Sequence, residues 1–83
     1  MSSFLTYIIF SNSKNKFYVG STNNLQRRLL EHNSRQTKST KFGVPWEIVY
    51  FKEFDSKSNA ARLESAIKKR GIKRYLMDLS FSG

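Results

Sequence analysis

The absence of cysteine from a chain of 83 residues is the feature that most limits how it can fold. A chain of this length is expected to form one domain, residues 1–83, with a modest core and a small margin of stability. Neither a disulfide nor a thiolate metal site can reinforce that core. Seven Phe, four Tyr and one Trp must therefore supply much of the buried apolar surface.

The charge balance gives the first indication of function. Fifteen Lys and Arg against six Asp and Glu give a formal net charge of +9. Such a field attracts polyanions, nucleic acid first and an anionic membrane surface second. The sequence has no apolar run of about 18 residues and no features of a signal peptide. We expect a cytoplasmic protein that binds nucleic acid and not membrane; the oligomeric state stays open.

The first half of the chain predicts a β-hairpin followed by a helix. Residues 4–10 and 16–21 are rich in β-forming residues and flank the polar turn 11–15. Helical spacing then runs over residues 25–33, and a polar loop follows over residues 34–45. Three candidate N-cap residues precede this helix: Thr22, Asn23 and Asn24.

The second half predicts one more strand and two more helices. Residues 46–54 form the third strand, and the next helix ends near Gly71, which suits a C′ position. A short final helix covers residues 72–79. The candidate N-caps of the second helix are Asp55, Ser56 and Ser58. The order β-β-α-β-α-α predicts an α+β fold with a three-stranded, mainly antiparallel sheet flanked by helices.

Tyr7 and Tyr18 lie eleven residues apart on the two strands of the predicted hairpin. Side chains alternate along a strand, so a turn with an even number of residues puts both tyrosines on one face, opposite or diagonal. Gly20 shares the face of Tyr18 and leaves a gap where a ligand or backbone can approach closely. The spacing alone favours the simpler interpretation, two strand tyrosines packed in the core.

The first predicted helix carries an arginine at the edge of its apolar stripe. Leu25, Leu29 and His32 form that stripe, which should face the sheet. Arg28 lies about 60° from Leu25 at the helical period, whereas Arg27 points to solvent. A guanidinium at this edge can hold a phosphate through two hydrogen bonds, or simply snorkel. The single histidine is either a hydrogen-bonded core residue or a proton relay.

Glu64 is the only acid among seven basic residues between Lys57 and Arg74. It lies at the border of one side of the second helix. That side comprises Ala60, Leu63, Ala66, Ile67 and Arg70. Glu64 either pairs with Lys68, which is worth about 0.2–0.5 kcal/mol, or holds a divalent cation against a bound phosphate. The ion pair is the simpler interpretation.

Taken together, these residues resemble the GIY-YIG nuclease family, which includes certain homing endonucleases and the 3′-side nuclease domain of bacterial excision repair. The first family tripeptide matches LTY at residues 5–7 in its tyrosine alone. The second matches YVG at residues 18–20 closely, and the spacing of the two tyrosines fits the family. The resemblance covers roughly residues 4–70 and looks closest to small, stand-alone bacterial members.

The same resemblance assigns three further residues. The run YVGSTNNLQRRLLEHN matches the family's first helix, so the family arginine and histidine fall on Arg28 and His32. The family glutamate falls on Glu64 in AARLESAIKK. Ser21 stands where some repair members carry a lysine.

The resemblance implies the GIY-YIG fold and hydrolysis of phosphodiester bonds at one Mg²⁺ or Mn²⁺. Glu64 would be the only protein ligand of the metal, and Arg28 would stabilise charge on the phosphoryl oxygens. Tyr18 would be the general base for the attacking water, with Tyr7 positioning it or relaying protons. A phenol is a weak base at neutral pH, and His32 could take the proton instead, so this choice stays open.

A basic stretch at the end of the second helix and the start of the final helix would bind backbone phosphates without reading sequence. Its residues are Lys68, Lys69, Arg70, Lys73 and Arg74. The predicted function is therefore a magnesium-dependent endonuclease that cuts DNA in preference to RNA, on structured or damaged substrates as in DNA repair.

Two other functions are compatible with the same sequence. The main alternative is a nucleic-acid binding module that keeps the fold but does not cut. The second is a basic protein-interaction domain with an exposed aromatic patch, formed by Phe42, Trp46 or Phe81.

Overall fold

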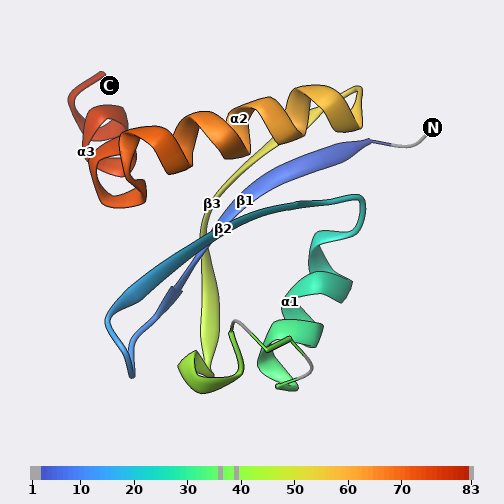
Figure 1. Cartoon of the computed structure of the whole chain (residues 1–83), viewed down its shortest axis with the longest axis vertical. Helices are drawn as coiled ribbons and strands as arrows, with labels where there is room; N and C mark the ends of the chain where they lie inside the picture. The colour runs from blue at the N-terminus through green and yellow to red at the C-terminus, as the bar shows by residue number, and fades with distance from the viewer. Residues whose placement is uncertain (1–2, 36, 39, 83) are drawn as a thin grey trace.

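The computed structural model describes residues 3–35, 37–38 and 40–82, and of residues 81–82 only the backbone. The three strands form one antiparallel sheet in the order β2-β1-β3 (Figure 1). The elements are β1 (Phe4–Ser11), β2 (Lys16–Thr22), α1 (Leu25–Asn33), the 3₁₀ turn η1 (Lys41–Gly43), β3 (Trp46–Phe54), α2 (Lys57–Arg70) and α3 (Ile72–Ser82). The predicted α+β class and the order β-β-α-β-α-α are confirmed.

Helix ends follow the local signals in the sequence. Among the candidate caps, Asn24 begins α1 and accepts a hydrogen bond from the backbone N–H of Arg27. Ser56 begins α2 and accepts from the backbone N–H of Asn59. Gly71 ends α2 with a φ of 94°, a conformation that glycine adopts without strain. Four details differ from the prediction. The first two strands each extend one residue further, to Ser11 and Thr22, the loop 34–45 contains η1, and α3 extends to Ser82.

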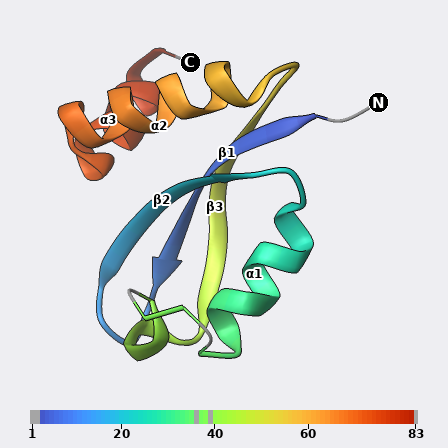
Figure 2. The ribbon, with the colours of Figure 1, turned by 45° about the vertical axis from the view of Figure 1, so that its right-hand side comes forward.

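The sheet separates two layers of packing. In the α1 layer, α1 packs beside a buried cluster that includes Tyr7 and Trp46. In the α2/α3 layer, on the opposite face, Ile8 of β1 packs against Ile67 of α2. Figures 1 and 2 show α1 well apart from the pair α2 and α3, with the twisted strands passing between them.

The two amphipathic helices match their predicted faces to different degrees. On α1, the stripe ending in His32 faces the sheet as predicted, and His32 is fully buried. On α2, Ala60 and Ile67 are buried, whereas Ala66 and Arg70, assigned to the same side of the helix, are exposed. The buried stripe is narrower than that side because α2 packs on the sheet along one edge and is open to solvent on the other.

The predicted aromatic patch does not form as a unit. Trp46 is 6% exposed and its Nε1 donates to the carbonyl oxygen of Thr40 at 2.7 Å, so its predicted exposure is wrong. Phe42 is 74% exposed, and the side chain of Phe81 lies outside the described residues. Within the described part of the chain, no helix has the length and apolar character that crossing a membrane requires.

Candidate active site

The hairpin turn, residues 12–15, sets the relative positions of the two tyrosines. Because this turn has an even number of residues, β1 and β2 pair Tyr7 with Gly20 and Ile9 with Tyr18. Both tyrosines therefore lie on the face that α1 covers, diagonal to each other. The predicted shared face is confirmed.

The gap at Gly20 is filled by the protein itself. A Cβ atom at this position would lie 2.6 Å from Oη of Tyr7, which is shorter than any ordinary contact. The phenol of Tyr7 thus lies against the backbone of β2, and the absence of a side chain at Gly20 makes room for it. The group that approaches here is the side chain of Tyr7, and not the ligand or backbone that the sequence suggested.

A chain of hydrogen bonds runs through the α1 layer. Oη of Tyr7 lies 2.9 Å from Nε2 of His32, and Nδ1 of His32 lies 2.7 Å from Oγ1 of Thr40. All three residues are buried. The carbonyl oxygen of Thr40 accepts from Nε1 of Trp46, so the segment before β3 holds the histidine in place.

Arg28 lies at the open end of this chain. A guanidinium only donates, and Nη1 of Arg28 donates to Oε1 of Glu31 at 2.9 Å. The guanidinium also interacts with the phenol of Tyr7. Both tautomers of His32 can satisfy the contacts of its two ring nitrogens with Tyr7 and Thr40. No buried side-chain polar atom of the described residues lacks a partner.

Burial keeps the buried members of this chain uncharged. Burial first, and then the positive charge of Arg28, lower the pKa of His32 to about 4. Burial also raises the pKa of Tyr7, while the hydrogen bond and charge of Arg28 act in the opposite direction. The pKa of Arg28 is raised, mainly by its hydrogen bond to Glu31. At neutral pH the network therefore combines a neutral imidazole, a neutral phenol and a guanidinium cation.

Glu64 reaches the same region from the α2/α3 layer. Its Oε1 accepts from Oγ of Ser21 at 2.8 Å, and its Oε2 lies 3.0 Å from Nζ of Lys68. Ser21 follows Gly20, against which the phenol of Tyr7 lies, so the carboxylate and the phenol meet β2 at neighbouring residues. The charge of Glu64 accordingly contributes to the raised pKa of Tyr7.

The five residues assigned by the resemblance come together at the edge of the sheet formed by β2. Four belong to the α1 layer and one, Glu64, approaches from α2. The ring of Tyr18 is half-buried and lies edge-on to that of His32, with 5.2 Å between the ring centroids. The side chain of Arg28 is one-third exposed, whereas that of Arg27 is 62% exposed and points to solvent as predicted.

The chemistry at Glu64 fits a hydrated divalent cation. Mg²⁺ prefers oxygen ligands and is commonly held by one or two carboxylates, waters and substrate phosphates. The side chain of Glu64 is 22% exposed, and a carboxylate has about four acceptor positions. The bonds from Ser21 and Lys68 therefore leave positions for a cation. No group of three or more His, Asp or Glu among the described residues could enclose a metal ion.

Two of the residues predicted to bind phosphates have carboxylate partners within the protein. Lys68 pairs with Glu64, so the ion pair considered from the sequence is present. Nε and Nη2 of Arg70 donate to the two carboxylate oxygens of Asp78 on α3, at 2.8 and 3.0 Å. Both partners of this second pair are half-exposed, so solvent screens their attraction.

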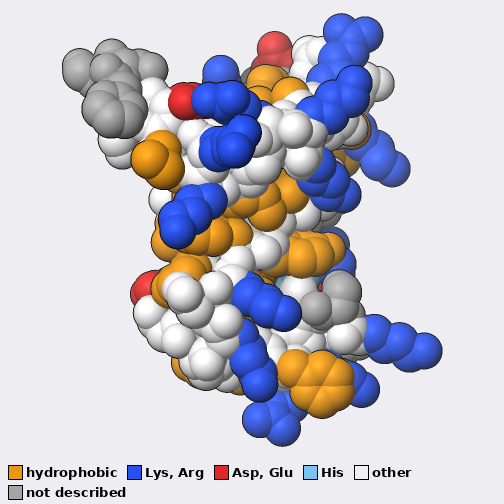
Figure 3. Space-filling model, turned by 60° about the vertical axis from the view of Figure 1, so that its left-hand side comes forward, with side chains coloured by type: hydrophobic (Ala, Val, Ile, Leu, Met, Phe, Trp, Pro, Cys, Tyr) orange, Lys and Arg blue, Asp and Glu red, His pale blue; other side chains and the backbone are white. Residues whose placement is uncertain are grey.

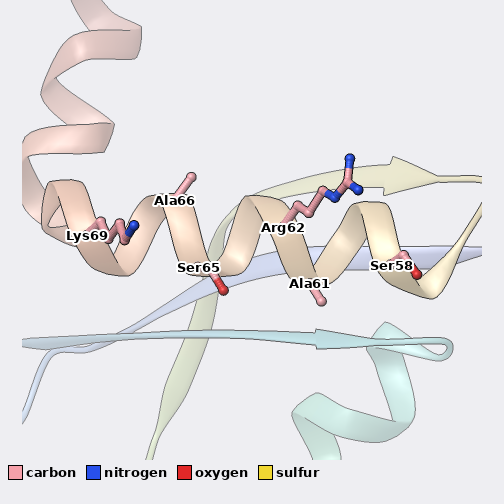
Figure 4. Close-up of a pocket in the computed structure, with 6 residues that line it drawn as sticks. All are labelled: Ser58, Ala61, Arg62, Ser65, Ala66 and Lys69. Carbon is pink, nitrogen blue, oxygen red and sulfur yellow. The ribbon is translucent and has the colours of Figure 1, made fainter.

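The remaining predicted residues, Lys69, Lys73 and Arg74, are exposed. Lys69 borders an open groove along α2, together with Arg62, which the sequence did not single out. Figure 4 shows small side chains between these two cations; the groove is lined by Ser58, Ala61, Arg62, Ser65, Ala66 and Lys69. Figure 3 shows Lys and Arg side chains spread over one whole face of the molecule, around apolar patches.

Sequence reasoning missed two residues that hold this arrangement, Ser21 and Thr40. The only indication of a role for Ser21 in the sequence is its position directly after the second tripeptide, residues 18–20. Thr40 lies in the polar loop 34–45, where no periodicity marks it.

Comparison with known proteins identifies the family of this chain. A sequence profile described as the GIY-YIG catalytic domain matches residues 3–75. The chain therefore belongs to the GIY-YIG family, and the predicted GIY-YIG fold is confirmed.

The individual relatives are small proteins. Uncharacterized protein L300 of Acanthamoeba polyphaga mimivirus is 37% identical over 86 residues, which cover 93% of this chain and 52% of that protein. This chain thus spans about half the length of the viral relative. UPF0213 protein lin0209 of Listeria innocua is 34% identical over 64 residues, 76% of this chain and 71% of that protein. The solution NMR structure of UPF0213 protein BH0048 from Bacillus halodurans aligns with a TM-score of 0.59 at 27% identity, covering 98% of this chain and 86% of that one.

Proposed function

We propose that this protein is a metal-dependent endonuclease that hydrolyses phosphodiester bonds in DNA, with structured or damaged DNA as its substrate. The observation that carries this proposal is the meeting of Tyr7, Tyr18, Arg28 and Glu64 at the β2 edge of a GIY-YIG domain. A single domain over residues 1–83, a cytoplasmic location and a role in DNA repair belong to the same proposal.

Glu64 would hold the Mg²⁺ or Mn²⁺ ion. When bound, such an ion polarises the scissile phosphate and stabilises the leaving oxygen. The partly exposed guanidinium of Arg28 stabilises charge on the phosphoryl oxygens, because it is already oriented by Glu31 and Tyr7.

Tyr18 is the general base in this proposal, and Tyr7 and His32 position it. Tyr18 is half-buried, whereas His32 is fully buried and contacts Tyr7 through Nε2. The raised pKa of Tyr7 disfavours its phenolate, so Tyr7 keeps its proton and acts by orienting the neighbouring groups. The basic residues of α2 and α3, Lys68, Lys69, Arg70, Lys73 and Arg74, would contact backbone phosphates.

A cleavage assay tests this function. Purified protein is incubated with plasmid, branched and tailed DNA, in Mg²⁺, in Mn²⁺ and in EDTA. We expect cleavage that needs the metal, falls about 100- to 1,000-fold in Arg28→Ala, and disappears in Glu64→Gln. Glu53→Gln, an exposed acid on β3, is the matched control and should cut normally.

Cleavage that persists in Glu64→Gln would come from a contaminant or from another site. Salt-dependent binding without any cleavage would support the alternative, a non-cleaving nucleic-acid binding module. The bonds that Ser21 and Lys68 make to both oxygens of Glu64 are the observation in favour of that alternative.

A further inference from the structure

A hollow beside Tyr18 has a lining that the proposed hydrolysis does not use. Its volume is about 360 Å³, within the range of about 300–1,000 Å³ typical of small-ligand sites. It is lined by two lysines of the hairpin and by aromatic side chains: Lys14, Lys16, Phe17, Tyr18, Phe42 and Trp46. No acidic residue contributes to it.

Phe42 is an exposed aromatic residue on a well-anchored turn. It is 74% exposed, yet η1 is fixed by the N–H of Gly43 and by Nε1 of Trp46, which both donate to the carbonyl oxygen of Thr40. The distances are 3.0 and 2.7 Å. Thr40 is also the residue that anchors His32. An aromatic ring that is exposed contributes little to the core, so the face of Phe42 opposite Lys41 is available to a ligand.

Three lysines lie at or beside the hollow. Lys14 and Lys16 line the hollow, and Nζ of Lys41 lies 5.0 Å from the ring centroid of Phe42. The ion pairs found among the described residues include none of these three lysines. Their charge complements phosphate groups on either side of a base that enters the hollow.

We propose that this hollow binds an unpaired nucleotide of the DNA strand that is cut. The base stacks on Phe42 beside Tyr18, and the flanking phosphates lie against the lysines. Proteins that bind single strands combine aromatic platforms with a basic groove in this way, because an unpaired base exposes a face that a paired base has already buried.

The position of Tyr18 connects the hollow to the site at the β2 edge. Its ring lines the hollow and also lies 5.2 Å from the ring of His32. The unpaired nucleotide would therefore lie next to the scissile phosphate. This inference rests on the proposed function and specifies its substrate, a duplex with a single-stranded extension beside the cut.

Binding measured without cleavage tests the inference. Fluorescently labelled blunt duplex and the same duplex with a single-stranded extension are titrated with protein in EDTA. We expect tighter binding of the extended DNA. Phe42→Ala should weaken that binding by roughly 5- to 100-fold and leave blunt-duplex binding unchanged. Phe42→Leu keeps an apolar side chain without a ring and should behave like Phe42→Ala.

Phe51→Ala is the matched control, because Phe51 is 59% exposed on β3 and does not line the hollow. It should bind both DNAs as the unmodified protein does. A 2-aminopurine base at the first unpaired position should change its fluorescence on binding, except with Phe42→Ala. The double variant Lys14→Ala/Lys16→Ala should lower the salt slope for extended DNA by about 0.7 for each phosphate that these lysines neutralise.

Equal affinity for the two DNAs would overturn the inference, and so would a Phe42→Ala variant that binds extended DNA normally. In the latter case the exposed ring would serve another ligand, such as a protein. An equal decrease in affinity for both DNAs would also overturn it, and circular dichroism melting identifies a variant that has unfolded. The binding assay does not depend on cleavage. If the protein prefers extended DNA in EDTA but cuts no DNA in the metal-dependent cleavage assay, the nuclease proposal is rejected and the proposed nucleotide-binding hollow is retained.

Discussion

The α1 layer buries linked polar groups, whereas the α2/α3 layer buries mainly aliphatic side chains. In the α1 layer Tyr7, His32 and Thr40 are buried and joined by hydrogen bonds. In the α2/α3 layer Ile8 and Ile67 pack together without exposed surface. Hydrogen bonds in a buried polar network hold its side chains in one orientation. Burial of aliphatic side chains stabilises the fold but does not depend on their orientation in this way. The α1 layer therefore orients most residues of the candidate site, whereas the α2/α3 layer supplies Glu64 and most of the aliphatic core.

Ile67→Ala should have the largest effect on stability. Removing a fully buried side chain of this size costs about 2–5 kcal/mol, which is a large part of the stability of a small domain. Urea denaturation measures the change in the free energy of unfolding. Met77→Ala, at a half-exposed position on α3, is the control and should be near neutral. If both variants unfold alike, the α2/α3 layer is not the main source of stability.

Acid should destabilise the protein through the α1 layer. Above pH 6.5 the histidine is neutral in both the folded and the unfolded protein, so its titration does not lower the free energy of unfolding there. Between pH 6.5 and about 4 only the unfolded state takes up the proton, because the pKa of His32 is lowered to about 4 in the fold. Stability should fall over this interval by on the order of 3 kcal/mol and fall no further through this group at lower pH.

Unfolding free energies at several pH values test this, with NMR titration of the imidazole as a direct reading. His32→Gln should flatten the curve over the same interval. An imidazole that titrates near its ordinary value in the folded protein would show that the layer does not hold it neutral.

Gly20→Ala should disturb both geometry and stability. The new Cβ would collide with the Tyr7 hydroxyl, and such overpacking costs about 1–3 kcal/mol. Cleavage should fall because the Tyr7–His32 bond is displaced. Adding Tyr7→Phe removes the colliding oxygen, so the double variant should recover part of the stability. Additive effects in this double-mutant cycle would mean that the two residues are not in contact.

Tyr50→Phe should have the smallest effect of the four. Oη of Tyr50 and Oη of Tyr75 lie 3.1 Å apart in the α2/α3 layer, and burial raises the pKa of Tyr50 to about 12. Losing one such hydrogen bond costs about 0.5–1.5 kcal/mol. DNA cleavage and binding should not change, and a change in either would mean that the contact between Tyr50 and Tyr75 also contributes to the site.

The sequence was sufficient wherever a local rule decides the structure. Asn24 and Ser56 cap helices because their side chains reach a backbone N–H three residues on. Side-chain alternation puts Tyr7 and Tyr18 on one face for any even-numbered turn, and the structure meets this condition with the four-residue turn 12–15 in place of the predicted turn 11–15. Arg28 and Arg27 differ in exposure as the helical period requires.

The sequence was insufficient where distant segments meet. Ser21 and Glu64 are 43 positions apart, and no periodicity relates a strand residue to a helix residue at that distance. Thr40 contacts His32 from a loop, where backbone paths follow no repeating pattern. The exposure of Ala66 and the burial of Trp46 depend on how far a helix and a turn overlap the sheet, which composition does not determine.

The place of β2 at the border of the sheet has a dynamic consequence. An edge strand has a single hydrogen-bonded neighbour, and for β2 that neighbour is β1. Fraying of β2 would move Tyr18 and Ser21 away from Tyr7 together, so the residues of the candidate site would no longer lie close to one another. Amide hydrogen exchange along β2 should therefore report the fraction of molecules in which the candidate site is assembled, separately from global unfolding.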